Sequence, residues 1–265
     1  MTNNMTTTDK KGGALDESAR NEAAAGASTP SDTPRKAPNP VSRRVWIALG
    51  ALCVISFLVH LAFLPQLPDM VPTHWDVNGD VNGWSSREAT LALNLIPLGL
   101  LLMFRVIPAI DPRGAAYERM SRFYTLFVSL FTLFMIAITW TTELTVFGIL
   151  PETGSPLGIG VSMVVGFVLI LLGNYLPKVK RNYSFGIKTP WAFDNDVNWR
   201  LTHRVGGVIM VVTGVLVMIS GLFSKQLGNL SVAVILVGVL GGCAIMYIYS
   251  YLVFRNGNKP LRRKM

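Results

Sequence analysis

Ionisable side chains inside apolar segments are the first residues in this sequence that could do chemistry. His60 interrupts the first long apolar segment, and Glu143 lies in the third. Such residues are costly in a membrane and commonly mark proton or ion sites. Together with His74 and Asp76 they could form a His–carboxylate cluster for a proton or a metal ion. The simpler interpretation is that His60 and Glu143 lie near the ends of their segments and contact water.

A second group of candidates lies in the polar loop 64–88, between the first two apolar segments. Its prolines and glycines predict turns rather than a helix. The loop could be solvated and held down by two interfacial tryptophans, or it could dock on the helix ends as a compact binding surface. The candidate binding residues are Pro72, His74, Trp75, Asp76, Gly79 and Trp84.

The repeat DVNGDVNGW in this loop superficially resembles a calcium-binding loop. Asp76, Asn78 and Asp80 alternate, but an EF-hand requires Glu at its twelfth position, where this chain has Arg87. The two cysteines lie in apolar segments and have no metal-ligand spacing. We therefore predict no metal site and no cofactor, and only a weak oxygen-ligand site stays open as an alternative.

The third group lies in the longest polar interruption of the chain, residues 178–207. We expect a tight non-helical loop from Asn182 to Pro190, with unusual backbone angles at Gly186 and a helix stop at the proline. The stretch could instead be an ordinary basic linker beside the membrane. Its density of Trp, Asn and Gly, which a simple basic linker does not need, favours a built site.

A helix is predicted to follow this loop and to lead into the next apolar segment. Asp194 is a good N-cap, and Asp196 in the first turn suits the helix dipole. Further along, Gly206 and Gly207 would allow the helix to bend into the bilayer.

Six apolar segments must position these residues. Of the 265 residues, 51% are hydrophobic and only 15% are charged, whereas a soluble domain carries about 25% charged residues. A bilayer core about 30 Å thick needs roughly 20 apolar residues in a helix, and lipid cannot satisfy bare backbone groups. We predict an all-α fold, a polytopic membrane bundle of six transmembrane helices. The segments are 44–64, 88–108, 122–147, 157–176, 205–223 and 229–254.

The positions of Lys and Arg predict the orientation. If both termini are cytoplasmic, all but Arg87 and Lys225 face the cytoplasm, as the positive-inside rule requires. Arg200 and Arg204, one helical turn apart, could then meet anionic head groups or a partner. The net charge of +9 is distributed between membrane segments, so we expect the lipid bilayer as a partner and no direct nucleic-acid binding.

Composition and segment order also predict the domain limits. The predicted parts are a disordered cytoplasmic tail (1–42), a first helix pair with its outer loop (43–122), a four-helix region (123–255) with the cytoplasmic loop 177–204, and a basic cytoplasmic tail (256–265). The first part has too few large apolar groups to offset the entropy of ordering.

Two motifs resemble those of the SdpI family of bacterial membrane proteins. The inner motif, RNYSFGIKTPWAFDNDVNWRLTHRVGG, matches the family pattern at Asn182, Gly186, Ile187, Lys188, Thr189, Trp191, Trp199, Thr202, His203, Arg204 and Gly207. The outer motif, LPDMVPTHWDVNGDVNGW, resembles an uncharacterised domain often fused to this family, and the matching residues are those named for the loop 64–88. The family often has Arg where this chain has Lys188, so a bidentate clamp for a carboxylate or phosphate is in doubt there.

The resemblance implies a protein of the bacterial plasma membrane without enzymatic activity. It implies immunity to, or sensing of, a secreted peptide toxin that attacks membranes, and signalling to a cytoplasmic transcriptional regulator. The outer loop would meet the peptide and the inner motif would report the event.

Two other functions stay open from the sequence. A small transporter or ion conductor would use His60, Glu143 and the outer loop. A membrane-embedded enzyme acting on lipid-linked substrates would use His203, Arg204 and Asp194.

Overall fold

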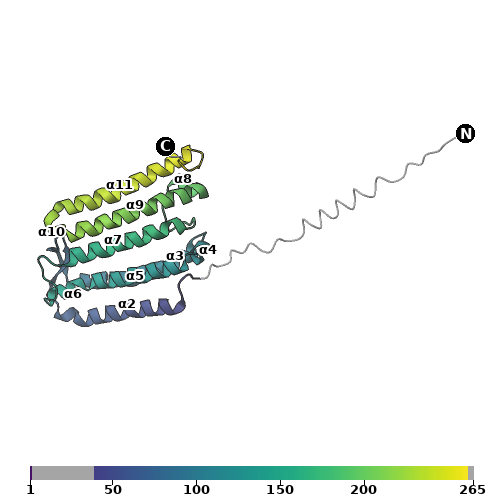
Figure 1. Ribbon diagram of the computed structural model, residues 1–265. Helices are drawn as coiled ribbons and strands as arrows, with labels where there is room; N and C mark the ends of the chain where they lie inside the picture. The colour runs from purple at the N-terminus through teal and green to yellow at the C-terminus, as the bar shows by residue number, and fades with distance from the viewer. Residues whose placement is uncertain (2–38, 262–265) are drawn as a thin grey trace. The chain divides into compact units, whose positions relative to one another are not determined.

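Six long apolar helices lie side by side in the structure (Figure 1). The computed structural model describes Met1 and residues 39–261. Each of the six helices is long and apolar enough to cross a membrane, which confirms the predicted all-α membrane bundle. Their bounds are α2 (Arg43–Phe63), α3 (Ala89–Ile110), α5 (Ser121–Thr139), α7 (Leu157–Tyr175), α9 (Asp196–Leu222) and α11 (Asn229–Arg255).

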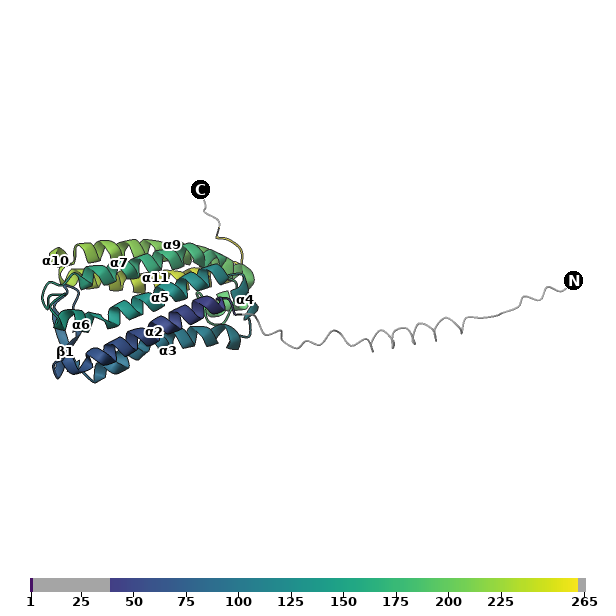
Figure 2. The same cartoon turned by 90° about the horizontal axis from the view of Figure 1, so that it is seen from below.

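Short elements connect these helices at both ends of the bundle. The strands β1 and β2, the helix α6 and the helix α10 gather at one end, the hairpin end, and α4 lies at the other, the basic end (Figure 2). The short helices are η1 (Leu64–Gln66), α4 (Ala115–Glu118), α6 (Thr141–Val146), η2 (Leu176–Lys178), α8 (Pro190–Asp194) and α10 (Ser224–Leu227).

The long helices pack as two groups of three. In one group α2, α3 and α5 contact one another, and in the other α9 lies between α7 and α11. The groups meet between α5 and α7, where the ring of Phe123 stacks on that of Tyr175 with centroids 3.9 Å apart. Large side chains thus separate these two helices, so a cavity can form between them.

Glycines bring α7 and α9 into close contact. A Cβ added at Gly207 would lie 2.6 Å from the carbonyl oxygen of Gly173 and 3.2 Å from the ring of Pro177. Gly206 and Gly207, where a bend was expected, lie inside one uninterrupted helix, α9, which runs from Asp196 to Leu222. These glycines serve close helix packing instead.

The outer loop folds into a β-hairpin rather than turns alone. Strands β1 (Met70–Trp75) and β2 (Val81–Ser86) pair antiparallel in a two-stranded sheet. The Asp-Val-Asn-Gly-Asp segment forms the turn between them, with Gly79 at a positive φ of 83°. Pro72 is tolerated because a strand in a two-stranded sheet has a free edge.

At the basic end, two caps differ from those expected. Thr189 caps α8 by accepting a hydrogen bond from the Ala192 N–H, so Pro190 begins a short helix instead of stopping one. The cap of α9 is Asn195 rather than Asp194, and its side chain accepts from the N–H groups of Val197 and Asn198.

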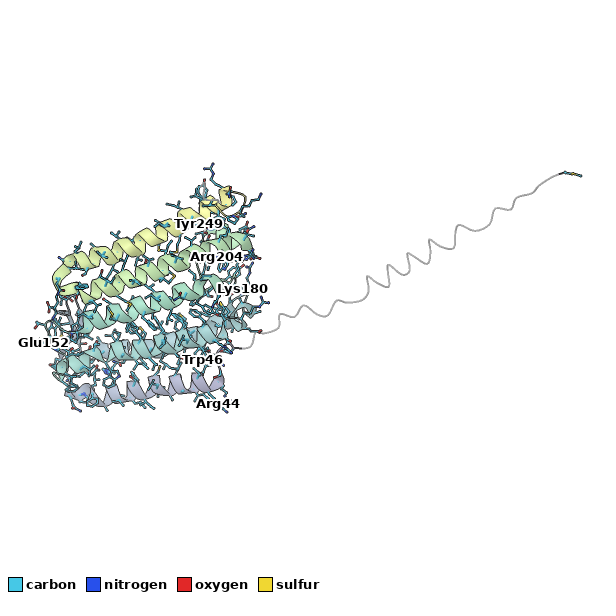
Figure 3. The ribbon with its side chains drawn as sticks, in the orientation of Figure 1. Arg44, Trp46, Glu152, Lys180, Arg204 and Tyr249 are labelled. Atoms are coloured by element: carbon cyan, nitrogen blue, oxygen red, sulfur yellow. The ribbon has the colours of Figure 1, made fainter. Side chains whose placement is uncertain are left out.

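The predicted tails lie largely outside the described residues, which exclude 2–38 and 262–265. Of the residues expected in the tail 1–42, Val41 is buried and Asn39 accepts hydrogen bonds from the Val41 N–H and the Trp46 indole. Charged residues divide between the two bundle ends. Arg44, Lys180 and Arg204 lie at the basic end and Glu152 lies at the hairpin end (Figure 3).

Candidate functional site

The hairpin is fixed to the ends of the spanning helices. Its turn exchanges backbone hydrogen bonds with the α6–α7 connection, from Val81 N–H to the Glu152 carbonyl (2.8 Å) and from Ser155 N–H to the Gly79 carbonyl (3.1 Å). The Thr142 hydroxyl of α6 donates to the Pro72 carbonyl at 2.8 Å. These contacts support the docked interpretation of the outer loop over the solvated one.

A cavity of about 560 Å³ lies beneath the hairpin. Its wall is mostly apolar and comes from α3, α5, α7 and the strand β1. The indole N–H of Trp75 is buried at this wall and has no acceptor among the described residues. Buried indole N–H groups usually find a partner, so this unsatisfied donor is an exception among the described residues. The side chains that line the cavity include Trp75, His74, Asp76, Leu93, Ile96, Phe134, Ile138, Thr139, Val161, Ser162 and Val165.

The carboxylates of the hairpin turn stabilise its backbone. Asp76 accepts from the N–H groups of Asn78 and Asp80 at 2.8 and 3.0 Å, and Asp80 accepts from the Gly154 N–H at 2.6 Å. Within residues 39–261, no group of three or more His, Cys, Asp or Glu side chains is placed to hold a metal ion. The structure therefore does not assemble the metal cluster that the sequence left open.

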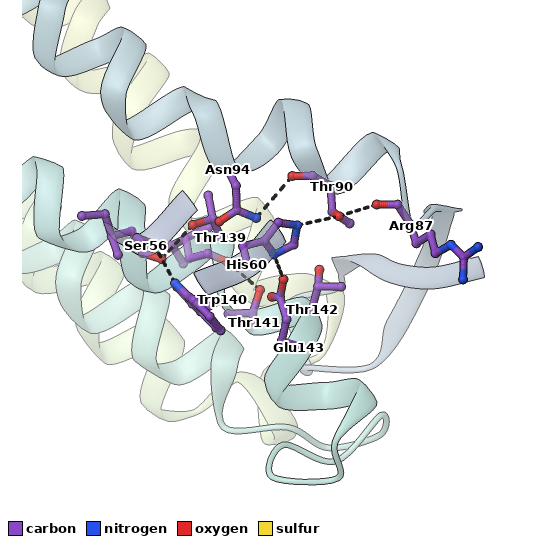
Figure 4. A network of polar contacts seen from close by, with 12 residues as sticks. Ser56, His60, Arg87, Thr90, Asn94, Thr139, Trp140, Thr141, Thr142 and Glu143 are labelled. Carbon is purple, nitrogen blue, oxygen red and sulfur yellow. Dashed lines mark hydrogen bonds and ion pairs between the residues drawn. The ribbon is translucent and has the colours of Figure 1, made fainter. Parts of the chain in front are cut away.

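His60 and Glu143 form a buried ion pair between α2 and α6 (Figure 4). The expectation that they contact water is wrong, because their exposed fractions are 0% and 1%. The Thr90 hydroxyl donates to the Arg87 carbonyl and therefore accepts from His60 Nε2–H, at 2.9 Å. The Trp140 ring, whose indole donates to Ser56 at 2.8 Å, meets the His60 ring edge to face. Neighbouring helices thus shield the pair from solvent.

With His60 Nε2–H donating to Thr90, one further proton is shared between His60 Nδ1 and the Glu143 carboxylate. Because His60 Nε2 carries a hydrogen, either His60 is protonated on Nδ1 as well and Glu143 is ionised, or both groups are neutral with the proton on Glu143. The second carboxylate oxygen of Glu143 is buried and has no partner among the described residues.

At the basic end, most residues of the inner motif hold the chain in place. Asn182 is fully buried, donates to the Lys180 and Phe185 carbonyls at 2.8 and 2.9 Å, and accepts from the Ser184 N–H at 3.0 Å. Gly186 has φ 118°, and an added Cβ would collide with His203. The glycine is therefore required by both backbone conformation and space.

Trp199 and His203 connect this loop to α9. The Trp199 indole donates to the Val179 carbonyl at 2.8 Å, and its ring stacks on His203. The Ile187 N–H donates to His203 Nε2 at 3.1 Å, so Nδ1 carries the hydrogen and donates to the Trp199 carbonyl at 2.8 Å. Both imidazole nitrogens are occupied in a structural role, which weakens the enzyme alternative based on His203, Arg204 and Asp194.

A polar network missed by the sequence reasoning joins the inner motif to α11. Asn198 donates to the Ser250 carbonyl at 3.0 Å and accepts from the Ser250 and Thr202 hydroxyls at 3.0 and 2.9 Å. The Thr189 hydroxyl is hydrogen-bonded to Ser250 as well. Asn and Ser within helices gave a weak signal, because such residues are also common on solvated faces.

Three motif residues remain at the surface or near it. Trp191 packs against Tyr247 and Tyr251 of α11. Lys188 and Arg204 are exposed, and neither forms an ion pair within the described part of the chain. Of the predicted inner site, these two residues are thus the charged groups exposed at the surface.

Asp111 is a second residue that the sequence reasoning missed. Its carboxylate accepts from the Tyr117 hydroxyl at 3.0 Å, from the Tyr183 N–H at 3.0 Å and from the Ser184 hydroxyl at 3.2 Å. Burial raises the pKa of Tyr117, so this phenol stays protonated and donates. Asp111 thereby joins the α3–α4 turn to the loop of the inner motif. The Asp-Pro pair at 111–112 was a turn signal that could have identified it.

Comparisons with known proteins give matches in the regions that contain the two motifs. Residues 178–250 match the model of the SdpI/YfhL protein family, and residues 51–98 match that of a domain of unknown function, DUF1648. Over 212 residues the chain is 23% identical to a protein named Immunity protein SdpI from Bacillus subtilis (strain 168). The match covers 80% of this chain and 96% of that protein. No solved structure matches the chain.

Proposed function

Because the chain belongs to the SdpI/YfhL family of membrane proteins, we propose that it protects a cell against a membrane-active peptide toxin. The family supports an immunity-type function, and the relative covered almost completely by this chain is named an immunity protein. The proposed location is the bacterial plasma membrane, which the chain crosses six times without catalysing a reaction.

The proposed orientation places the hairpin outside the cell and the basic end in the cytoplasm. Arg44, Lys180 and Arg204 share one end of the bundle, as Figure 3 shows, whereas Glu152 lies at the opposite end. Positive charge resists transfer across the membrane, so the basic end is the one expected to stay inside. The cavity beneath the hairpin is then accessible to a peptide arriving from outside.

The observation that carries the proposal is this cavity and its unpaired donor. A largely apolar space of about 560 Å³ suits the side chains of a membrane-active peptide, whose sequence must be apolar enough to enter lipid. The Trp75 indole N–H could donate to a peptide carbonyl, since an extended segment brings unpaired carbonyls with it. Sequestering the peptide at the hairpin would keep it from the bilayer.

A survival experiment with matched variants tests the proposal. Cells that lack the gene are complemented with each variant and challenged with a panel of membrane-active peptide toxins. Val165→Phe narrows the cavity, whereas Val164→Phe, whose wild-type residue is similarly exposed on α7 (36% against 38%), does not line it. We expect the first variant to lose protection and the second to retain it at equal membrane abundance.

Trp75→Phe removes the donor while retaining the ring. We expect toxin binding to weaken about fivefold, corresponding to one hydrogen bond. Trp84→Phe is the control, because Trp84 is exposed and does not line the cavity.

Equal protection by Val165→Phe and the unmodified chain would reject the cavity as the toxin site. If cells that lack the gene survive every toxin of the panel as well as cells that carry it, the immunity function itself is rejected.

Sensing is the second part of the proposal and involves the basic end. Lys188 and Arg204 are exposed cations on an otherwise ordered loop and helix, so they are candidates to contact a cytoplasmic transcriptional regulator. We expect Lys188→Gln with Arg204→Gln to abolish a toxin-induced transcriptional response while survival is maintained. An unchanged response would exclude these residues as the regulator contact.

Ion conduction is a second candidate function, favoured by the buried His60–Glu143 pair. A proton shared by the pair could move through it if water reached the unpartnered oxygen of Glu143. Proton flux into liposomes that contain the purified protein, lost in Glu143→Gln, would support this function. An absence of flux in the unmodified protein would exclude it.

A further inference from the structure

A second cavity, at the basic end, is lined by cationic side chains from two separate parts of the chain. It has a volume of about 570 Å³. We refer to it as the basic pocket. One wall comes from α4 and its flanks, and the other comes from η2, the residues after it and the first turns of α9. Its charged lining residues are Arg113, Arg119, Lys178, Lys180, Arg181, Arg200 and Asp196.

The single carboxylate of the basic pocket is already paired. Arg181 contacts Asp196 at 2.9 Å and also donates to the carbonyls of Phe193 and Asp194, at 2.9 and 2.8 Å. Arg113 lies over the rings of Tyr183 and Phe193. These contacts fix two of the cations and neutralise the one anion, so the remaining cations are not balanced by the pocket itself.

Of the four other cations, Lys178 lies over the Tyr175 ring, and the remaining three are exposed. Arg119, Lys180 and Arg200 form no ion pair within the described residues. They line the pocket together with the buried residues Val179 and Trp199. The positive-inside rule explains basic flanks in general, but it does not require cations from distant segments to line one concave surface.

The position of the pocket indicates the kind of anion that it meets. α3 ends at Ile110, α7 ends at Tyr175 and α9 begins at Asp196, so the pocket lies where three spanning helices leave the hydrocarbon. Lipid phosphates occupy this level of a bilayer, and basic pockets between spanning helices bind anionic head groups. A cytoplasmic protein partner would more readily use Lys188 and Arg204, which are exposed but do not line the pocket.

We propose that the basic pocket binds the phosphate head group of an anionic phospholipid, with Arg119, Lys180 and Arg200 as its contacts. The bound lipid would join the α3–α5 connection to the start of α9 through charge-assisted hydrogen bonds. This proposal does not depend on the toxin or on the direction in which the chain is inserted.

Native mass spectrometry of the full chain tests this proposal. The protein in neutral detergent is titrated with phosphatidylglycerol, cardiolipin or phosphatidylcholine, and lipid adducts are counted. We expect the double variant Lys180→Gln with Arg200→Gln to bind the anionic lipids at least about tenfold more weakly, because each basic residue near an anionic lipid contributes roughly fivefold. Lys188→Gln with Arg204→Gln removes the same charge outside the pocket and should change binding less than threefold.

Three outcomes would overturn the proposal. An equal loss in both double variants would indicate attraction by net charge alone. Unchanged binding in the pocket variant would exclude the pocket as the site. Competition by glycerol phosphate at the lipid's own affinity would assign the site to a soluble phosphate. The charge-conserving variant Lys180→Arg with Arg200→Lys should retain binding, which separates loss of charge from misfolding.

Discussion

The two ends of the bundle use their polar residues differently. At the basic end, the buried groups Asn182, Asn198 and His203 have found partners within the chain. At the hairpin end, the Trp75 indole and one oxygen of Glu143 are buried without a partner among the described residues. Unsatisfied buried groups cost free energy, and folded proteins contain few of them. The hairpin end thus retains unsatisfied buried groups, whereas the buried polar residues of the inner motif serve chiefly as a scaffold.

The largest effect is expected for the buried ion pair. Glu143→Leu should lower the free energy of unfolding by about 3–5 kcal/mol, because it leaves His60 buried without its partner. Denaturant titration in detergent micelles measures this change. His60→Leu combined with Glu143→Leu should lose less than either single variant, and exposed Glu152→Leu should stay within about 0.5 kcal/mol. Additive losses in the double variant would show that the two residues are not coupled.

Asp111→Asn should have the next largest effect and tests the scaffold at the basic end. The Asn side chain would present either an N–H donor or a weaker oxygen acceptor to the Tyr117 hydroxyl and the Tyr183 N–H. We expect the free energy of unfolding to fall by about 3 kcal/mol. Proteolysis within the loop 182–189 should accelerate in parallel. Asp69→Asn is the control, since the Asp69 side chain is 91% exposed. A loop that is cleaved no faster would mean that Asp111 does not hold it.

Gly207→Ala tests the close contact of α7 with α9. The added methyl group would lie 2.6 Å from the Gly173 carbonyl oxygen, so we expect a loss of about 1–3 kcal/mol in the free energy of unfolding. At Gly241 of α11 nothing lies within 4 Å of an added Cβ, and Gly241→Ala should be neutral or stabilising by up to about 1 kcal/mol. Should both variants have equal stability, the glycine packing described for α9 would be wrong.

The smallest effect distinguishes two neighbours within the inner motif. Lys188→Gln should change stability by less than about 0.5 kcal/mol, because the side chain is exposed. Thr189→Val should cost about 0.5–2 kcal/mol, because it removes the cap of α8 and the hydrogen bond to Ser250. Melting midpoints of the two variants in one detergent provide the comparison. Equal midpoints would contradict a scaffolding role for Thr189.

Local sequence signals correctly predicted a tight loop followed by a helix in the inner motif, but they did not predict the role of each residue. Asn182 and Gly186 were expected in a tight loop, and they form one. Pro190 and Asp194 were assigned the wrong local roles, because a proline can start a helix and adjacent Asp and Asn residues compete as caps. The outer loop was expected to consist of turns because its prolines and glycines hid two short strands.

The sequence alone determined that this chain forms six membrane-length helices with basic residues concentrated between them, because hydrophobicity and charge act locally along the chain. Only the tertiary structure decided which polar side chains are satisfied. The partners of those groups come from distant segments, as in Tyr183 with Asp111, Thr142 with Pro72 and His60 with Glu143. Hydrogen bonds depend on contact within a few ångströms, and sequence spacing does not specify such contacts across separate helices.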